Sequence, residues 1–419
     1  MTTKTSTTPK YAILFIAGLM GGYEFQLIGI VFACDIMFLA IAVVGLGTFW
    51  RSAAGSGTRN TAVLLLSFPF VAVGVDGFNS VPLSDMARGG ARNVVFVATV
   101  VSAVYIWKIF GWRRFCWFNV AVLFSRTLFG YGNEATAALV GASAEVTTDL
   151  AYIVKYLNAQ ILIFPVLFLL GRWPMIVFFS LVVVGVADVV LLDARSGGVI
   201  FGLIAVLYLW RNSRANSGSA IKWAIGISIA IALVGYIVGK NFDIDDARFL
   251  ERWEGSNSER FDMAYEAWKT ILANPITGVG SWQLTNGYFV GGATRDQAIL
   301  GVHSGALMLM SEYGIWGTLV TSAMLLLMAR SVRRVVSVKG WNPTELRDMM
   351  PFIIQSLVVA VYILSNCPFN GFVRIIFGFN VGCAFVVLDD FRSRSPANRT
   401  DRAVSMPVLK PSAPSAPSA

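Results

Sequence analysis

The run RNVVFVATVVSAVYIWKIF, from Arg92 to Phe110, is almost wholly apolar and is about as long as a helix must be to cross a lipid bilayer. Similar runs recur between Tyr11 and Leu388, and they lack the alternation of a membrane β-barrel. The chain of 419 residues is 56% hydrophobic and 14% charged, whereas a soluble domain is about 25% charged. We therefore expect an all-α, polytopic membrane helical bundle without strands.

The hydropathy pattern predicts about twelve transmembrane helices in a single membrane domain, residues 1–389. The predicted spans are residues 11–28, 30–49, 61–80, 92–110, 115–131, 151–170, 173–192, 197–211, 220–239, 303–328, 350–367 and 371–389. Residues 11–49 could instead form one long helix and a re-entrant segment. A large outer loop covers residues 240–302. Residues 390–419, rich in Pro, Ser and Ala, are expected to be a disordered cytoplasmic tail.

Lysine and arginine gather in one set of loops, which by the positive-inside rule face the cytoplasm. These cations are Arg51, Arg59, Arg113, Arg114, Arg172, Arg211, Arg214, Arg330, Arg333, Arg334 and Lys339. Both termini are then cytoplasmic, and the large loop lies on the outer side. The net charge of +9 follows from this bias, so no nucleic-acid partner is expected. The four cysteines form no close-spaced ligand set, so we expect no disulfide framework, metal site or cofactor.

The outer loop is expected to carry an amphipathic helix. Ser256–Glu259 reads as a capping box, and the helix should end near Asn274 and Pro275. Its apolar stripe consists of Phe261, Ala264, Trp268, Ile271 and Leu272. Such a helix lies along the membrane surface or packs on the bundle. Arg260 falls in the first turn, where it opposes the helix dipole; it could bind an anion there or pair locally with a glutamate.

His303 is the only histidine in the chain and stands where the outer loop meets an apolar helix. An imidazole there is well placed to move protons at neutral pH; the alternative is a polar residue that caps the helix. At about 100° per residue, Gly314 and Gly317 lie on the same helical face as His303. These small residues would admit another helix, which we favour, or a polyprenyl chain.

Cations also fall near the predicted outer ends of four spans, where charge at membrane depth is costly and marks sites. They are Arg126, Lys155, Arg195 and Arg374. Together they suggest an anion pocket; the alternative is that they snorkel to the interface. Asp76 and Asp188 could be their partners.

Three pieces of sequence together resemble the O-antigen ligase and polymerase family of bacterial envelope glycosyltransferases. They are Asp193–Gly198, in which Ala194 departs from the family's serine; Arg260 followed by the amphipathic helix and Asn274–Gly280; and His303-Ser304 with Gly314 and Gly317. The resemblance covers about residues 190–330.

The resemblance implies transfer of a saccharide chain from undecaprenyl pyrophosphate at the periplasmic face. A ligase uses lipid A–core as acceptor, and an O-antigen or exopolysaccharide polymerase uses another lipid-linked repeat unit. Arg195 and Arg260 would hold the pyrophosphate, and His303 would serve the acceptor. Guanidinium groups can neutralise a departing pyrophosphate without a metal ion, and an imidazole can act as the general base. A single displacement would invert the configuration of the anomeric carbon.

Several points stay open in the sequence. Arg248, Arg252 and Arg295 of the outer loop could be further anion contacts. Ligase and polymerase are both compatible with the motifs. A polytopic transporter or flippase of lipid-linked saccharides fits twelve spans, although no repeat relates the two halves. A membrane scaffold without chemistry leaves the spacing of histidine, arginine and glycine unexplained.

Overall fold

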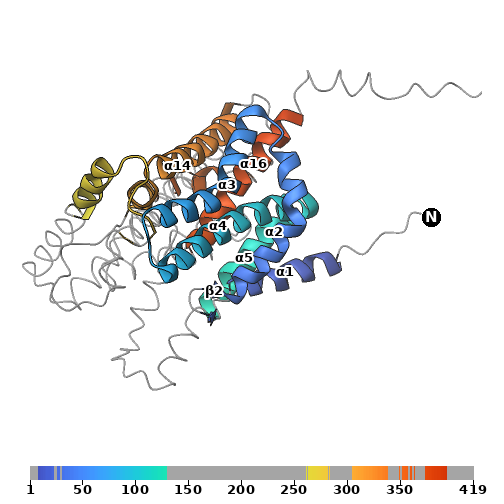
Figure 1. Ribbon diagram of the computed structural model, residues 1–419. Helices are drawn as coiled ribbons and strands as arrows, with labels where there is room; N and C mark the ends of the chain where they lie inside the picture. The colour runs from blue at the N-terminus through green and yellow to red at the C-terminus, as the bar shows by residue number, and fades with distance from the viewer. Residues whose placement is uncertain are drawn as a thin grey trace, which may run out of the picture.

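The computed structural model describes residues 8–22, 26–28, 31–129, 261, 263–281, 283, 304–337, 349, 352–356, 359–360, 363 and 373–393. This part of the chain is almost wholly helical, as predicted, and Figure 1 shows its long helices packed into one bundle. The helices are α1 (Thr8–Gly22), α2 (Ala33–Ser52), α3 (Ser56–Phe78), α4 (Leu83–Phe110), α5 (Trp112–Phe129), α14 (Gly305–Ser337), α16 (Val373–Ser393) and a shorter one over residues 263–273.

The beginning of the chain has two helices, as in the first arrangement expected for residues 11–49, but the first of them is shorter than predicted. Helix α1 has 15 residues, or about 22 Å, less than the ~30 Å of a hydrocarbon core. An antiparallel hairpin of β1 (Gln26–Ile28) and β2 (Val31–Phe32) then leads into α2. The glycines that end α1 disfavour a longer helix, and pairing satisfies the backbone of the connection. Among the described residues, this hairpin is the one departure from an all-helical fold.

Four helices are long and apolar enough to cross a membrane, namely α2, α3, α4 and α14. They coincide with the spans predicted at residues 30–49, 61–80, 92–110 and 303–328. Helices α5 and α16 coincide with the spans predicted at 115–131 and 371–389. The spans predicted at 151–170, 173–192, 197–211 and 220–239, and most of 350–367, lie outside the described residues. The count of twelve therefore stays a prediction.

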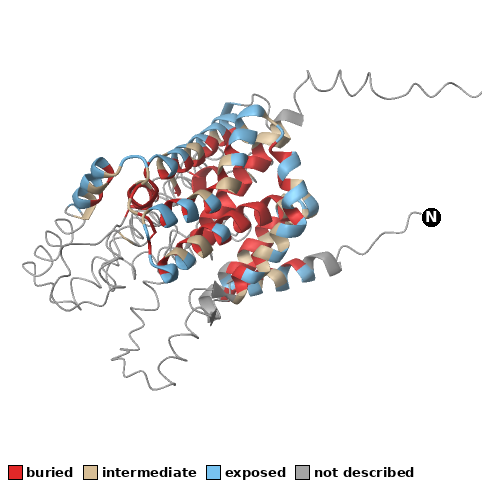
Figure 2. Ribbon diagram, in the orientation of Figure 1, coloured by how far each residue is buried: buried red, intermediate tan, exposed pale blue. Residues whose placement is uncertain are grey.

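Helix α4 lies at the centre of the bundle, in contact with α2, α3, α5 and α16. Its close approach to α16 depends on a glycine, because a Cβ atom at Gly382 would lie 2.6 Å from the carbonyl oxygen of Val100. Nearby, Phe96 stacks on Phe377 with ring centroids 5.1 Å apart. Small residues let helix backbones approach closely within a membrane. Figure 2 shows buried residues along the facing sides of these helices.

Contacts at one end of the bundle join helix ends that the Lys and Arg pattern predicts to lie on the same, cytoplasmic side of the membrane. Lys108, near the end of α4, forms ion pairs of 2.7 and 2.6 Å with Asp389 and Asp390 of α16. The start of α3 lies against the later part of α14, where a Cβ atom at Gly57 would be 3.1 Å from Nη1 of Arg330. The connection from α3 to α4 lies at the opposite end, beside the short loop helix (Figure 1).

Helix α14 is broken at Gly314, where φ is 55° and ψ is −130°. Figure 1 shows the first turns of α14 end-on, whereas the remainder runs along the bundle. Residues 315–337 alone would extend about 34 Å, enough to cross the hydrocarbon core. The predicted single face through His303, Gly314 and Gly317 is therefore wrong, because that face requires an unbroken helix.

Replacing Gly314 with alanine should destabilise the protein strongly. An alanine would be strained at this positive φ, at a cost of about 1–3 kcal/mol, and its Cβ atom would lie 2.5 Å from the carbonyl oxygen of Ile276. Gly74→Ala is the matched control, because that helical glycine has no atom within 4 Å of an added Cβ. Thermal unfolding in detergent should show a much lower melting temperature for Gly314→Ala and no decrease for Gly74→Ala. Equal melting temperatures for the two variants would contradict this explanation.

Candidate functional site

Most of the residues predicted for the site lie outside the described residues. They are Lys155, Arg195, Arg248, Arg252, Arg260, Arg295 and His303. Arg126 lies on α5, and only its backbone is described. Arg374 is described on α16, and the chain directly after His303 is described as well. The geometry next to His303 therefore shows what surrounds the predicted site.

Ser304 caps α14. The backbone N–H of Leu307 donates a hydrogen bond of 3.3 Å to Ser304 Oγ, the bond by which an N-cap serine satisfies a free amide of the first turn. Ser304 is buried, and its hydroxyl also donates to the carbonyl oxygen of Ile363 at 3.5 Å. The helix-capping role that we considered as the alternative for His303 is thus filled by Ser304.

The glycine turn after the loop helix pairs with the broken part of α14. The N–H groups of Val279 and Gly280 donate to the carbonyl oxygens of Ser311 and Glu312 at 3.0 and 2.8 Å. In return, the N–H of Ile315 donates to the carbonyl oxygen of Ile276 at 3.3 Å. The break removes helical partners from these groups, and the turn replaces them.

This pairing requires glycine on both segments. Gly278 and Gly280 have φ of 65° and 90°, and Cβ atoms there would meet the Glu312 carbonyl and the Val81 side chain. The predicted approach of a helix to Gly314 is therefore replaced by the approach of the turn. Two of the three sequence pieces behind the family resemblance are therefore in direct contact, through the Asn274–Gly280 turn and the part of α14 around Gly314.

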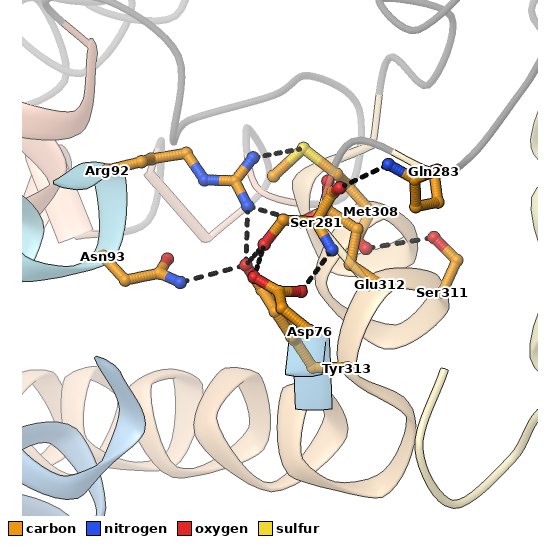
Figure 3. Close-up of polar contacts among 9 residues, drawn as sticks. All are labelled: Asp76, Arg92, Asn93, Ser281, Gln283, Met308, Ser311, Glu312 and Tyr313. Atoms are coloured by element: carbon orange, nitrogen blue, oxygen red, sulfur yellow. Dashed lines mark hydrogen bonds and ion pairs between the residues drawn. The ribbon is translucent and has the colours of Figure 1, made fainter. Parts of the chain in front are cut away.

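A buried polar cluster joins this turn to α3, α4 and α14 (Figure 3). We call it the Tyr313 cluster, and it consists of Asp76, Arg92, Asn93, Ser281, Glu312 and Tyr313. At its centre, the hydroxyl of Ser281 donates to Asp76 Oδ2 at 2.7 Å and lies 2.7 Å from the Tyr313 hydroxyl. The N–H of Ser281 donates to Asp76 Oδ1 at 2.6 Å. One aspartate of α3 thus holds the end of the turn by two bonds.

Helix α4 supplies the cation of the Tyr313 cluster. Nη2 of Arg92 forms an ion pair with Glu312 and donates to the Tyr313 hydroxyl at 3.0 Å. Asn93 Nδ2 donates to the same hydroxyl, also at 3.0 Å. Arg92 and Glu312 are 2% and 3% exposed. Because the pair is removed from water, each charge is compensated mainly by the opposite charge of its partner.

The charges of the Tyr313 cluster indicate a scaffold and not an anion pocket. Within these six residues, two carboxylates face one guanidinium, and the guanidinium already contacts Glu312. A pyrophosphate requires an excess of cations. The cluster instead holds the turn and the first half of α14 against two other helices, and it does so on the helix that begins next to His303.

Arg374 lies near the start of α16 and pairs with Asp35 near the start of α2. Nη2 of Arg374 is 2.5 Å from Asp35 Oδ2, and both side chains are buried. Arg374 therefore joins two helices, and any anion that it contacted would share it with Asp35. Asp76, which we considered as a partner for the outer cations, is bonded to Ser281.

Sequence reasoning missed Arg92, Ser281 and Tyr313, and it set Glu312 aside because Glu312 would lie opposite His303 on a straight helix. One signal was available for the pair. Arg92 and Glu312 are each charged residues within a predicted span, and such residues are usually paired or functional. No spacing rule connects them, because they are 220 positions apart.

The apolar helices define a membrane protein. Residues 178–322 match the protein family described as O-antigen ligase. The match includes Arg195, Arg260 and His303, and it extends past the break in α14. It supports the O-antigen ligase family and confirms the resemblance expected from the sequence. A glycosyltransferase-like role in surface polysaccharide biosynthesis follows from that family. No curated protein matches the chain.

Proposed function

We propose that this protein transfers a saccharide chain from undecaprenyl pyrophosphate to an acceptor, in the manner of an O-antigen ligase, at the periplasmic face of the inner membrane. The acceptor of a ligase is lipid A–core. The observation that carries the proposal is the family match over residues 178–322, the region in which a glycine turn is locked against the helix that begins beside His303.

The reaction is one displacement at the anomeric carbon. The acceptor oxygen forms a bond to that carbon, the bond to the pyrophosphate oxygen breaks, and the acceptor proton passes to His303. Arg195 and Arg260 hold the departing pyrophosphate, because guanidinium groups are always charged and can bind it in bidentate fashion. The anomeric configuration of the donor is inverted.

The described framework supports this assignment through position. Because Ser304 caps α14, our proposal assigns the His303 imidazole to chemistry and not to capping. The Tyr313 cluster and the glycine turn tie the first half of α14 to α3 and α4. A general base must be held within hydrogen-bond reach of its proton, and these contacts of the adjoining helix favour a fixed position for it.

A deletion strain tests the class of reaction. In a strain without this gene, surface polysaccharide run on a gel should be lost, and free lipid-linked polymer should accumulate if the protein is a ligase. Accumulation of single repeat units would instead identify a polymerase. Purified protein should transfer saccharide without an ion gradient; a requirement for a gradient, without turnover, would favour a transporter or flippase.

Arg260→Ala and Arg195→Ala should weaken donor binding, each by at least the ~1.5–3 kcal/mol of a charge-assisted hydrogen bond. The expected result is a raised KM for the lipid-linked donor in a reconstituted assay. Lys269→Ala is the matched control, because Lys269 is a cation of the same loop that is exposed and paired with Glu266 at 2.7 Å. An equal change in KM for all three variants would mean that only the general charge of the loop matters.

A further inference from the structure

The helix of residues 263–273 divides its surface into three faces. Ala267 and Ile271 are buried, so one side packs on the protein. At about 100° per residue, Phe261, Tyr265, Trp268 and Leu272 fall within about 60° of one another on an adjacent side. The sequence pattern treats these two sides as a single stripe, but only the half near Ile271 is covered.

The second side is apolar and exposed. Phe261, Tyr265, Trp268, Leu272 and the following Ile276 are 72%, 51%, 47%, 63% and 67% exposed, and we call them the aromatic stripe. Figure 2 shows exposed residues along this helix where it stands off the bundle. Four of these large apolar side chains share one side of the helix, and Ile276 follows in the turn. Together they expose apolar surface that water solvates poorly, and such patches mark interaction surfaces.

The third side is polar and borders the aromatic stripe. Lys269 bonds to Glu266 at 2.7 Å, and both are about half exposed. The Lys269 ammonium also lies 4.4 Å from the ring centroid of Tyr265. Charged residues next to an aromatic row are the composition of a helix that lies in the plane of a membrane interface.

The end of the aromatic stripe lies next to a helix that is long and apolar enough to cross a membrane. The carbonyl oxygen of Ile276 accepts the hydrogen bond from Ile315 of α14. From there, Ile315, Trp316 and Leu319 are exposed on the part of α14 that is apolar enough to span the bilayer. Lipid that covers this flank of α14 would therefore lie close to the end of the stripe.

We propose that the aromatic stripe inserts into the lipid headgroup and acyl boundary of the outer leaflet, so that the membrane interface is its partner. The helix then contacts protein on one side, lipid on the second and water on the third. Because Asn274–Gly280 follows directly and pairs with α14, this contact also anchors the turn beside the candidate site. The proposal does not depend on saccharide transfer.

Spin labelling tests the proposal in the full chain, reconstituted into vesicles of phosphatidylethanolamine and phosphatidylglycerol. Nitroxides are placed at Leu272→Cys on the stripe and at Ala273→Cys, the exposed neighbour on the polar side, in a Cys367→Ser background. The described native cysteines are buried. Collision rates are measured with oxygen, which concentrates in lipid, and with a water-soluble nickel chelate.

The ratio of oxygen to nickel collisions should be several-fold higher at position 272 than at position 273. Equal ratios typical of water at both positions would overturn the proposal. Low collision rates with both reagents at position 272 would show that protein, such as a second copy of the chain, covers the stripe, and would overturn it as well. Tyr265→Cys examines the same face if the label at 272 prevents folding.

Discussion

His303→Ala is expected to reduce saccharide transfer by about 10²–10⁴-fold, the contribution typical of a general base. The acceptor hydroxyl would keep its proton as the new bond forms, whereas donor binding by the arginines would be unchanged. The loss should therefore fall mainly on kcat. It is measured by complementation of the deletion strain, with surface polysaccharide on a gel, and by single-turnover assays of the purified enzyme.

Ser304→Ala is the control for this experiment. It removes the cap of α14 and should cost about 1 kcal/mol of stability without the loss of chemistry. Both variants must be present in the membrane at the level of the unmodified protein. Full restoration by His303→Ala would remove the base from the mechanism and leave the arginines, or transport, as the better account of the site.

The second large effect concerns the buried Arg92–Glu312 pair. Glu312→Gln or Arg92→Met should each destabilise the protein by about 3–5 kcal/mol, because one buried charge loses the opposite charge that compensates it. Thermal unfolding in detergent is the measurement. Glu266→Gln breaks the exposed pair with Lys269 and should cost no more than about 1 kcal/mol.

The double variant makes this prediction sharper. Arg92→Met/Glu312→Gln removes both charges of the pair, so neither is left without its partner, and it should be more stable than either single variant. Additive losses in the double variant would mean that each side chain acts through separate contacts. In that case the pair would not be the element that holds α4 to α14, and the scaffold would rest on the bonds of Asp76 and Ser281.

Much of the helical framework could be predicted because it depends on local composition. The apolar run at residues 92–110 lies within α4, and all but the last two residues of the run at 61–80 lie within α3. A bilayer requires such long continuous helices, whose backbone groups are satisfied internally. The loop helix was also predicted to end near Asn274, and it ends at residue 273. Proline at 275 makes that end readable from sequence, because the residue before a proline disfavours helix.

The break in α14 could not be predicted in the same way. Gly314 within an apolar run reads equally well as a packing contact between helices. Its positive φ is stable because the turn at Ile276–Gly280 supplies the hydrogen bonds that the helix loses there. Those hydrogen bonds come from a segment some 35 positions earlier, so the residues around Gly314 cannot predict them.

The sequence by itself determined the membrane class, the family resemblance and the residue types offered for chemistry, because composition, hydropathy and motif order are properties of the chain alone. Only the tertiary structure decided which groups meet. It paired Arg92 with Glu312 and Arg374 with Asp35, joined Asp76 to Ser281, and set the glycine turn against the broken α14. A buried polar group must find a partner wherever packing brings one, and that partner depends on the whole bundle.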